Sequence, residues 1–189
     1  THELTDKWFY WSDAGGLQLY WMASPWPEDR GDWHSPERVR ETPSLRVHHG
    51  ELFEELAQLD PVARDDRLKE AAIWNLRQHP GKALENWIAN VSRLLFGWPF
   101  SHRPKPWSEA AAYAIPNLAL LLLALAAFRT SRRAPAPLPD GLVVLLLFGA
   151  VAFGASSLLS AYGRQFTPLV PLVGLWIARM RYSQVAQAG

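Results

Sequence analysis

Apolar residues dominate the chain from Ala110 onward. Residues 110–128 carry no charged side chain, and residues 141–161 carry none either. Each run reaches the roughly 20 apolar residues that a helix needs to cross about 30 Å of hydrocarbon. A shorter run at 166–178 contains two prolines and reaches that length only together with the residues before it. The pattern predicts a mainly α, integral membrane fold with three C-terminal transmembrane helices, spanning about 110–128, 141–161 and 163–179.

Arginines around these runs predict the orientation of the chain. Arg129, Arg132 and Arg133 lie between the first two runs, and Arg179 and Arg181 follow the last one. Positive residues in short loops stay on the cytoplasmic side of a membrane. Both clusters therefore predict a multi-pass protein of the cell membrane whose first 109 residues are extracytoplasmic, that is, periplasmic.

The preceding half of the chain is patterned differently. Residues 7–11 (KWFYW) and 16–22 (GLQLYWM) are aromatic-rich, and a Ser-Asp-Ala-Gly-Gly segment separates them. This arrangement predicts two short strands around a turn. Residues 24–43 are rich in Pro, Asp, Glu, Arg and Trp and indicate an irregular but ordered loop. A helical pattern begins near Gly50, so the sequence predicts a small α+β head at residues 1–79.

Proline and aspartate mark the ends of one helix in this head. Asp60 followed by Pro61 predicts an N-cap with proline at the first helical position. The helix should end near His79 because the residue before a proline disfavours the helical conformation.

Residues 80–98 show a sustained helical period. Apolar side chains recur at i, i+3, i+4 and i+7, and polar side chains occupy the other side. An amphipathic helix directly before a membrane span indicates an interfacial helix on the outer leaflet. The alternative is an ordinary helix that packs on the soluble head. We therefore expect an interfacial helix and linker at 80–109, followed by the membrane domain at 110–189.

Charge divides the chain at the same place. Its formal net charge is +1, with 18 acidic and 19 basic side chains, but residues 1–109 hold an excess of acidic groups and residues 110–189 an excess of arginines. A uniform globular domain would not separate its charges in this way. The absence of cysteine excludes disulfide and thiolate-metal sites. Because the chain begins at Thr1 without a signal peptide, we expect the native protein to extend upstream.

Few residues of the head suggest chemistry by their spacing. His48, His49 and Glu51 lie close together, but they match no established metal-ligand pattern and indicate loop or helix-capping histidines. Asp65 and Asp66 indicate surface charge paired with the nearby Arg67 and Lys69. The sequence contains no glycine-rich phosphate loop, nucleophile elbow or nucleic-acid signature, and we expect no metal site.

Arg164 is the most informative charged residue. It lies in the segment Ala-Tyr-Gly-Arg-Gln-Phe-Thr-Pro, at the predicted outer end of a membrane helix and just before Pro168 and Pro171. An arginine at such a helix break can pair bidentately with a phosphate. It can equally extend its side chain to the lipid headgroups. The residues themselves leave both interpretations open.

The order of the motifs resembles a known family. An aromatic Gly-Gly-x-x-Leu-Tyr-Trp segment precedes a Pro/Trp-rich loop and a helix that ends Leu-Arg-Gln-His-Pro. An amphipathic Trp-x-x-Asn-x-x-Arg-Leu-Leu-Phe helix, two spans and Gly-Arg-x-x-x-Pro-x-x-Pro follow. This order resembles the C-terminal part of bacterial GT-C membrane glycosyltransferases of the dolichyl-phosphate-mannose–protein mannosyltransferase type (family 39), which include aminoarabinose transferases.

The resemblance implies an enzyme that moves a sugar from a polyprenyl-phosphate carrier to an extracytoplasmic acceptor. The family's catalytic aspartate would lie upstream of Thr1, so the resemblance implies no catalytic residue in this chain and a missing N-terminal set of membrane helices. Arg164 matches the Gly-Arg segment and is the candidate contact to the carrier phosphate. Tyr20 and Trp33 belong to the region that would cap the acceptor side, which makes them candidate substrate-binding residues. The expected partners are membrane lipid, the lipid-linked sugar donor and an unidentified acceptor, with no nucleic acid.

Other functions are compatible with the same topology. A non-enzymatic membrane-anchored protein with a partner-binding extracytoplasmic head explains the spans equally well. A transporter subunit explains them less well, because the spans hold few polar residues beyond Asn117, Ser156 and Ser157.

Overall fold

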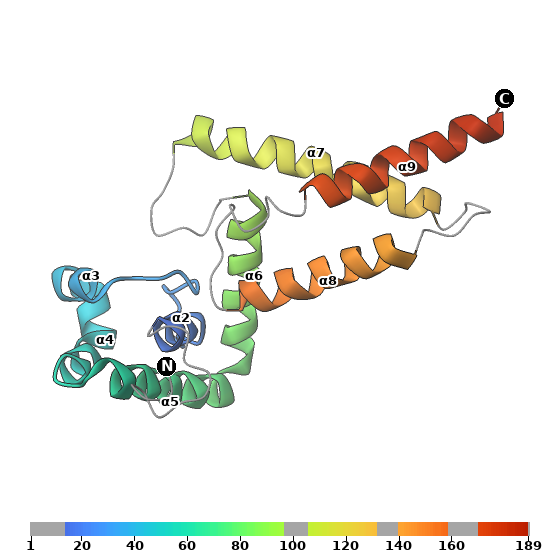
Figure 1. Cartoon of the computed structure of the whole chain (residues 1–189). Coiled ribbons are helices and arrows are strands. Elements are labelled where there is room, and N and C mark those ends of the chain that lie inside the picture. The colour runs from blue at the N-terminus through green and yellow to red at the C-terminus, as the bar shows by residue number, and fades with distance from the viewer. Residues whose placement is uncertain (1–13, 97–105, 132–139, 159–169, 189) are drawn as a thin grey trace. The chain divides into compact units, whose positions relative to one another are not determined.

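The computed structural model describes residues 14–96, 106–131, 140–158 and 170–188 (Figure 1). Within these ranges every regular element is an α-helix. The chain forms two compact units, and the first of them ends at Asn90, inside helix α6. The first unit contains the head, and the second contains the apolar C-terminal helices.

Proline begins four successive helices that start in the head. Its fixed φ suits the first turn of a helix, where its missing N–H would have no helical partner. These helices are α3 (Pro36–Glu41), α4 (Pro43–Leu56), α5 (Pro61–Gln78) and α6 (Pro80–Phe96).

The predicted boundaries of α5 are confirmed. The side chain of Asp60 accepts hydrogen bonds from the backbone N–H groups of Val62 and Ala63, at 2.9 and 3.1 Å. At the other end His79 is the C-cap residue, directly before Pro80. Both ends are therefore set by local sequence.

The strand predicted at residues 16–22 is wrong, because this segment is helix α2 (Gly15–Met22). Tyr20 and Trp21 are buried in the head, and α2 packs along α5. Nearly every side chain in this short segment is apolar, so its own pattern cannot distinguish strand from helix. Packing against α5 decides the conformation. The other predicted strand, at residues 7–11, lies outside the described residues, so the described head is helical rather than α+β.

Two further expectations for the head need correction. The loop predicted at residues 24–43 is irregular only as far as Ser35, because α3 occupies Pro36–Glu41. The side chain of Ser35 caps α3 by accepting from the N–H of Arg38 at 3.3 Å. Helix α4 also begins earlier than the expected Gly50, at Pro43.

Side chains from four elements build the core of the head. Its centre is Trp21, 1% exposed, together with Val39 and Leu68 at 0% and 2%. The remaining buried members of this cluster are Tyr20, Ala23, Phe53, Leu56 and Ala72. The loop between α2 and α3 is thus held between a packed helix pair and the start of α6.

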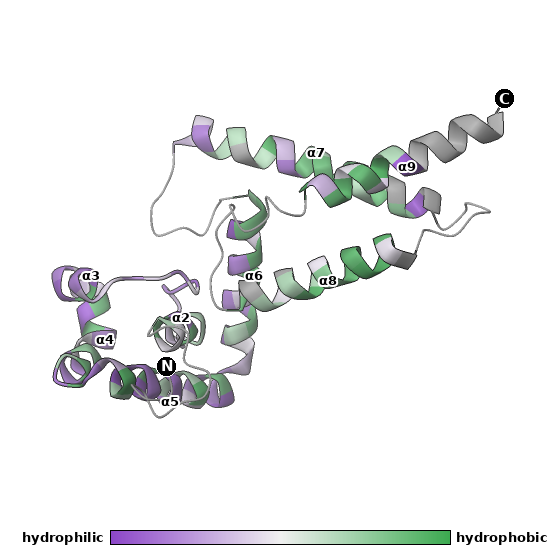
Figure 2. Ribbon diagram, in the orientation of Figure 1, coloured by the Kyte–Doolittle hydropathy of each residue, from purple (hydrophilic) through white to green (hydrophobic). Residues whose placement is uncertain are grey.

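Three apolar helices follow in the second unit, namely α7 (Trp107–Ser131), α8 (Asp140–Ser157) and α9 (Val170–Ala188). Figure 2 shows hydrophobic residues along both α7 and α8. By length and composition, the stretch Trp107–Ala126 is long and apolar enough to cross a membrane, and only 6% of it is buried. Such exposure is unlike the core helix of a soluble protein. The apolar stretches of the other two helices are shorter within the described residues, at Gly141–Ala152 and Val170–Arg179.

Helix α6 packs on the head through its polar side. Asn86 and Asn90 are fully buried, whereas Leu84 and Ile88 on the apolar side are 55% and 54% exposed. The first half of α6 thus contacts the head, and the choice between an interfacial helix and an ordinary packed helix stays a prediction. In the first half of α6 the contact nevertheless differs from an ordinary amphipathic packing, in which the apolar stripe is buried, whereas Leu94 in the second half is 1% exposed.

Candidate functional site: an aromatic groove beside a buried polar network

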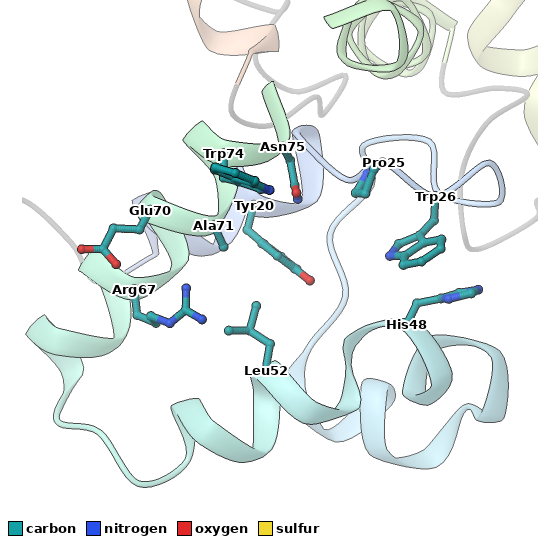
Figure 3. A pocket seen from close by; sticks show the side chains of 10 residues that line it. All are labelled: Tyr20, Pro25, Trp26, His48, Leu52, Arg67, Glu70, Ala71, Trp74 and Asn75. Atoms are coloured by element: carbon teal, nitrogen blue, oxygen red, sulfur yellow. The ribbon is translucent and has the colours of Figure 1, made fainter. Parts of the chain in front are cut away.

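A groove of about 510 Å³ lies on the head between α4 and α5 (Figure 3). One face of α5 forms a side of it, since residues at i, i+3, i+4, i+7 and i+8 share a helix face. These residues are Arg67, Glu70, Ala71, Trp74 and Asn75. The groove therefore combines an indole ring with charged and amide groups along a single helix.

The facing side of the groove comes from α4 and the loop after α2. His48 and Leu52 lie one turn apart on α4, and Pro25 and Trp26 come from the loop. The rings of Trp26 and His48 stack with centroids 3.9 Å apart and an interplanar angle of 19°. This stack holds the indole of Trp26 at the edge of the groove.

Two tryptophans of the groove remain open to solvent. The side chain of Trp74 is 65% exposed and that of Trp26 is 37% exposed. Figure 3 shows Trp74 on α5, the Trp26–His48 pair across the groove, and the ring of Tyr20 between them. Exposed apolar patches rimmed by polar residues mark interaction sites or ligand-binding grooves.

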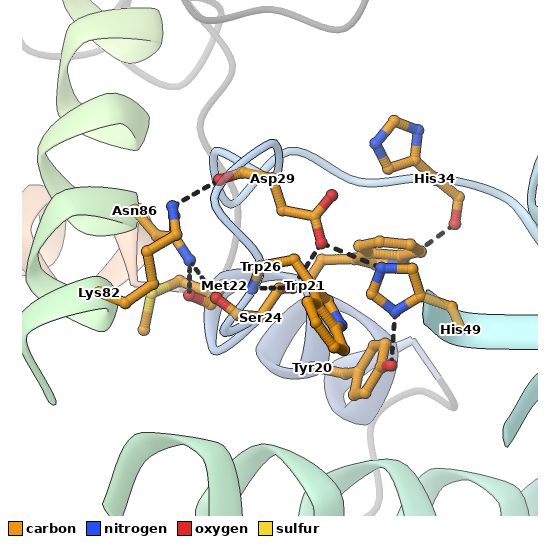
Figure 4. A network of polar contacts seen from close by, with 10 residues as sticks. All are labelled: Tyr20, Trp21, Met22, Ser24, Trp26, Asp29, His34, His49, Lys82 and Asn86. Carbon is orange, nitrogen blue, oxygen red and sulfur yellow. Dashed lines mark hydrogen bonds and ion pairs between the residues drawn. The ribbon is translucent and has the colours of Figure 1, made fainter. Parts of the chain in front are cut away.

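Behind the groove lies a buried polar network that begins at Tyr20 (Figure 4). The Tyr20 hydroxyl is 2.7 Å from Nδ1 of His49, and Nε2 of His49 is 3.0 Å from Oδ2 of Asp29. The hydroxyl of Ser24 donates to the same carboxylate oxygen. His49 and Ser24 are 1% and 0% exposed, so the network is closed to water.

The charge of Asp29 fixes the direction of its own hydrogen bonds. Burial alone would raise the pKa of Asp29, but the hydrogen bonds from His49 and Ser24 outweigh burial and hold the pKa below its usual value. An ionised carboxylate only accepts, so Nε2 of His49 donates to it. Nδ1 of His49 accepts from the Tyr20 hydroxyl when the ring is neutral and donates to it when the ring is protonated. Burial, with the Asp29 charge as the next cause, raises the pKa of Tyr20 well above its usual value and keeps the hydroxyl protonated.

Helix α6 holds the other side of the same loop. Nδ2 of Asn86 donates to the backbone carbonyls of Met22 and Ser24 at 3.0 and 2.9 Å. Nζ of Lys82 donates to the carbonyl of Asp29 at 2.7 Å and to Oδ1 of Asn86 at 2.9 Å. The loop that carries Trp26 is therefore fixed from both sides by buried hydrogen bonds.

The network does not form a hydrolytic triad. A nucleophilic serine needs a hydrogen bond to its general base. Ser24 instead donates to Asp29, and the two nitrogens of His49 already bind Asp29 and Tyr20. The network positions the loop and the ring of Tyr20. Among the described residues no group of three or more His, Cys, Asp or Glu side chains could hold a metal ion.

The candidate residues from sequence lie in different places. Tyr20 lines the groove and also belongs to the buried network. Trp33 packs against the hydrophobic cluster of the head, and its backbone N–H donates to Oδ1 of Asp32 at 2.9 Å. Arg164 lies outside the described residues. The structure thus brings Tyr20, but not Trp33, to the groove.

Sequence reasoning missed the roles of His48 and His49. Both lie inside α4, so the expectation of loop or capping histidines is wrong. Their partners, Trp26 and Asp29, come from a loop about 20 residues away, and no local spacing identifies them. The alternation of polar and aromatic residues on α5 was a usable signal for the groove, because Arg67, Glu70 and Trp74 recur at helical intervals.

Asp65 is another correction, because it is fully buried rather than on the surface. Its Oδ1 accepts from the backbone N–H of Gly16 at 2.6 Å, and its Oδ2 pairs with Lys69 at 2.5 Å. Arg67 pairs with Glu55 instead, at 2.8 Å. Asp65 therefore ties the start of α2 to α5.

Searches against protein-family models, curated proteins and solved structures find no match to this chain.

Proposed function

We propose that this chain is the C-terminal portion of a glycosyltransferase that moves a sugar from a polyprenyl-phosphate carrier to an extracytoplasmic acceptor. The chain contributes the periplasmic head and three membrane helices. Arg164 contacts the carrier phosphate, and the head receives the acceptor. The catalytic base comes from residues upstream of Thr1.

The polarity of α6 supports the interfacial position of the head, on which this proposal depends. Asn86 and Lys82 attach α6 to the head, which leaves Leu84 and Ile88 exposed. An exposed apolar helix face shortly before a helix able to span a membrane fits an interfacial position. Nδ2 of Asn117 on α7 also donates to the carbonyl of Leu95, near the end of α6. The head would then rest at the depth where the phosphate of a polyprenyl carrier lies.

The order of motifs and the groove support an enzyme rather than an anchor. A non-enzymatic anchored protein explains the spans and α6, but it accounts less easily for Arg164 between a glycine and two prolines. It also leaves the solvent-exposed rings of Trp74 and Trp26 without a ligand, unless a protein partner covers them.

Transfer by the full-length protein tests the proposal. Membranes from cells that lack the gene supply the native acceptor, and radiolabelled polyprenyl-phosphate mannose, glucose and aminoarabinose serve as donors. We expect transfer from one of these donors, and Arg164→Ala to lower it about 10- to 100-fold because a charged hydrogen bond to phosphate contributes about 1.5–3 kcal/mol. Arg181→Ala, which removes an arginine after the last apolar run, is the control.

Two results would contradict different parts of the proposal. An absence of transfer from every donor, with membrane insertion intact, would remove the glycosyltransferase function and favour the anchored partner-binding protein. Normal transfer by Arg164→Ala would remove only its contact with the phosphate.

A further inference from the structure

We propose that the groove between α4 and α5 is a saccharide-binding site, because the solvent-open rings of Trp26 and Trp74 and the polar side chains Arg67, Glu70 and Asn75 line one depression. This assignment rests on the proposed function in one respect: the saccharide bound in the groove would be the acceptor of the sugar, and the acceptor would be a glycan. The binding itself does not require transfer, so it can be measured separately.

The lining matches the two-sided chemistry of a sugar ring. A pyranose has a flat face of C–H groups, which packs on the electron-rich face of an indole. Its hydroxyl groups both donate and accept hydrogen bonds. Trp74 supplies the aromatic face. The neighbouring Glu70 can accept hydrogen bonds from sugar hydroxyl groups, and Asn75 can both donate and accept them. All three side chains lie on one face of α5, so a single ring can meet them together.

The groove is held in shape before any ligand arrives. Trp26 is stacked on His48, and the backbone of its loop is fixed by Asn86 and Lys82. Tyr20, in the floor, is held by its hydrogen bond to His49. A preformed site loses little side-chain freedom on binding, which favours affinity for a weakly interacting, hydroxyl-rich ligand. Its volume of about 510 Å³ lies within the usual range for ligand pockets.

Other classes of ligand fit this groove less well. A nucleic acid needs a basic surface, but acidic side chains outnumber basic ones over residues 1–109. A lipid chain would cover Glu70 and the ion pair between Arg67 and Glu55 without offering hydrogen bonds in place of water, at a cost in desolvation. A peptide that binds by strand addition needs a sheet edge, and the described part of the head is helical.

Saccharide binding by the full chain in lipid nanodiscs tests the proposal. The probes are an array of bacterial cell-envelope oligosaccharides, followed by titration of the best binder with tryptophan fluorescence. We expect specific retention of at least one oligosaccharide. Trp74→Ala should weaken its binding about tenfold or more, because one aromatic face is lost. Trp74→Phe should retain most of the affinity, since it keeps a ring.

Ile73→Ala is the matched control, because Ile73 is the adjacent residue on α5, is 44% exposed and does not line the groove. It should bind like the unchanged protein. Failure of every oligosaccharide to bind, or binding that survives both Trp74→Ala and Trp26→Ala, would overturn the proposal. Saccharide binding without sugar transfer would instead contradict the proposed enzyme and leave this site in place.

Discussion

The hydroxyl of Tyr20 lies 2.7 Å from Nδ1 of His49, and this contact joins the groove to the buried polar network. One side of the tyrosine ring lines the groove, while its hydroxyl belongs to a hydrogen-bonded series that ends at Asp29 and Ser24. Substitutions within the network are therefore expected to affect both the stability of the head and the position of groove residues.

Tyr20→Phe tests the energetic value of this contact. The substitution keeps the ring but leaves Nδ1 of His49 buried without its hydrogen-bond partner, which costs about 1–3 kcal/mol. Denaturant unfolding of the full chain in detergent, followed by tryptophan fluorescence, measures the change. The free energy of unfolding of the double variant Tyr20→Phe/His49→Phe should fall by less than the sum of the decreases in the two single variants, because both polar partners are then absent. Strictly additive losses would show that the two side chains are not coupled.

Acidification should weaken the head through Asp29. The pKa of this carboxyl is lower in the folded protein than its ordinary value of 3.8. Its contribution to stability is therefore complete above about pH 4 and is lost as the pH falls through the folded-state value. Thermal unfolding should be measured from neutral to acidic pH. The unchanged protein should have a higher unfolding temperature than Asp29→Asn at neutral pH, and this difference should become smaller below about pH 4. Glu54→Gln, at an exposed position on α4, controls for the loss of one carboxyl group.

Gly16 and Gly15 form a matched pair at the start of α2. A Cβ added at Gly16 would lie 2.6 Å from Oδ1 of Asp65 and still closer to its backbone carbonyl oxygen, whereas a Cβ at Gly15 meets nothing within 4 Å. We expect Gly16→Ala to lower the free energy of unfolding by about 1–3 kcal/mol through overpacking. Gly15→Ala should leave it unchanged or raise it by up to about 1 kcal/mol. Equal effects on thermal unfolding would contradict the close approach of α2 to Asp65.

Membrane contact by α6 can be measured with a single label, because this chain contains no cysteine. Leu84→Cys and Glu85→Cys lie next to each other but point about 100° apart around the helix. A fluorophore attached at residue 84 should be quenched by brominated lipids in nanodiscs, and one attached at residue 85 much less. Equal quenching at both positions, or none at either, would contradict an interfacial α6.

Local sequence predicted the features that depend on neighbouring residues. Asp60 and Pro61 mark the start of α5 and His79 marks its end, because capping and proline geometry act within a few residues. The helical period of α6 was likewise evident. Features that local sequence did not predict depend on residues far away in the chain. Gly16 bonds to Asp65, 49 residues away, and the packing of α2 on α5 overrides its strand-like composition.

The candidate site illustrates the same limit. Tyr20 could be singled out from sequence through a family resemblance, whereas His49 could not, because its two partners lie 20 and 29 residues before it. Trp74 stands on a helix whose existence was predictable, but the groove beside it requires the loop of Trp26 to fold back onto α4. A binding surface assembled from three segments cannot be derived from the period of one of them.

The packing of the first half of α6 separates two properties that an ordinary amphipathic helix couples. Asn86 and Lys82 secure the head by hydrogen bonds, so Leu84 and Ile88 are not needed for its folding. Under the proposed interfacial position, substitutions on the apolar side would change the attachment of the head to lipid without loosening the Trp26 loop. Attachment to lipid and folding of the head would then vary independently, although residues of one helix serve both.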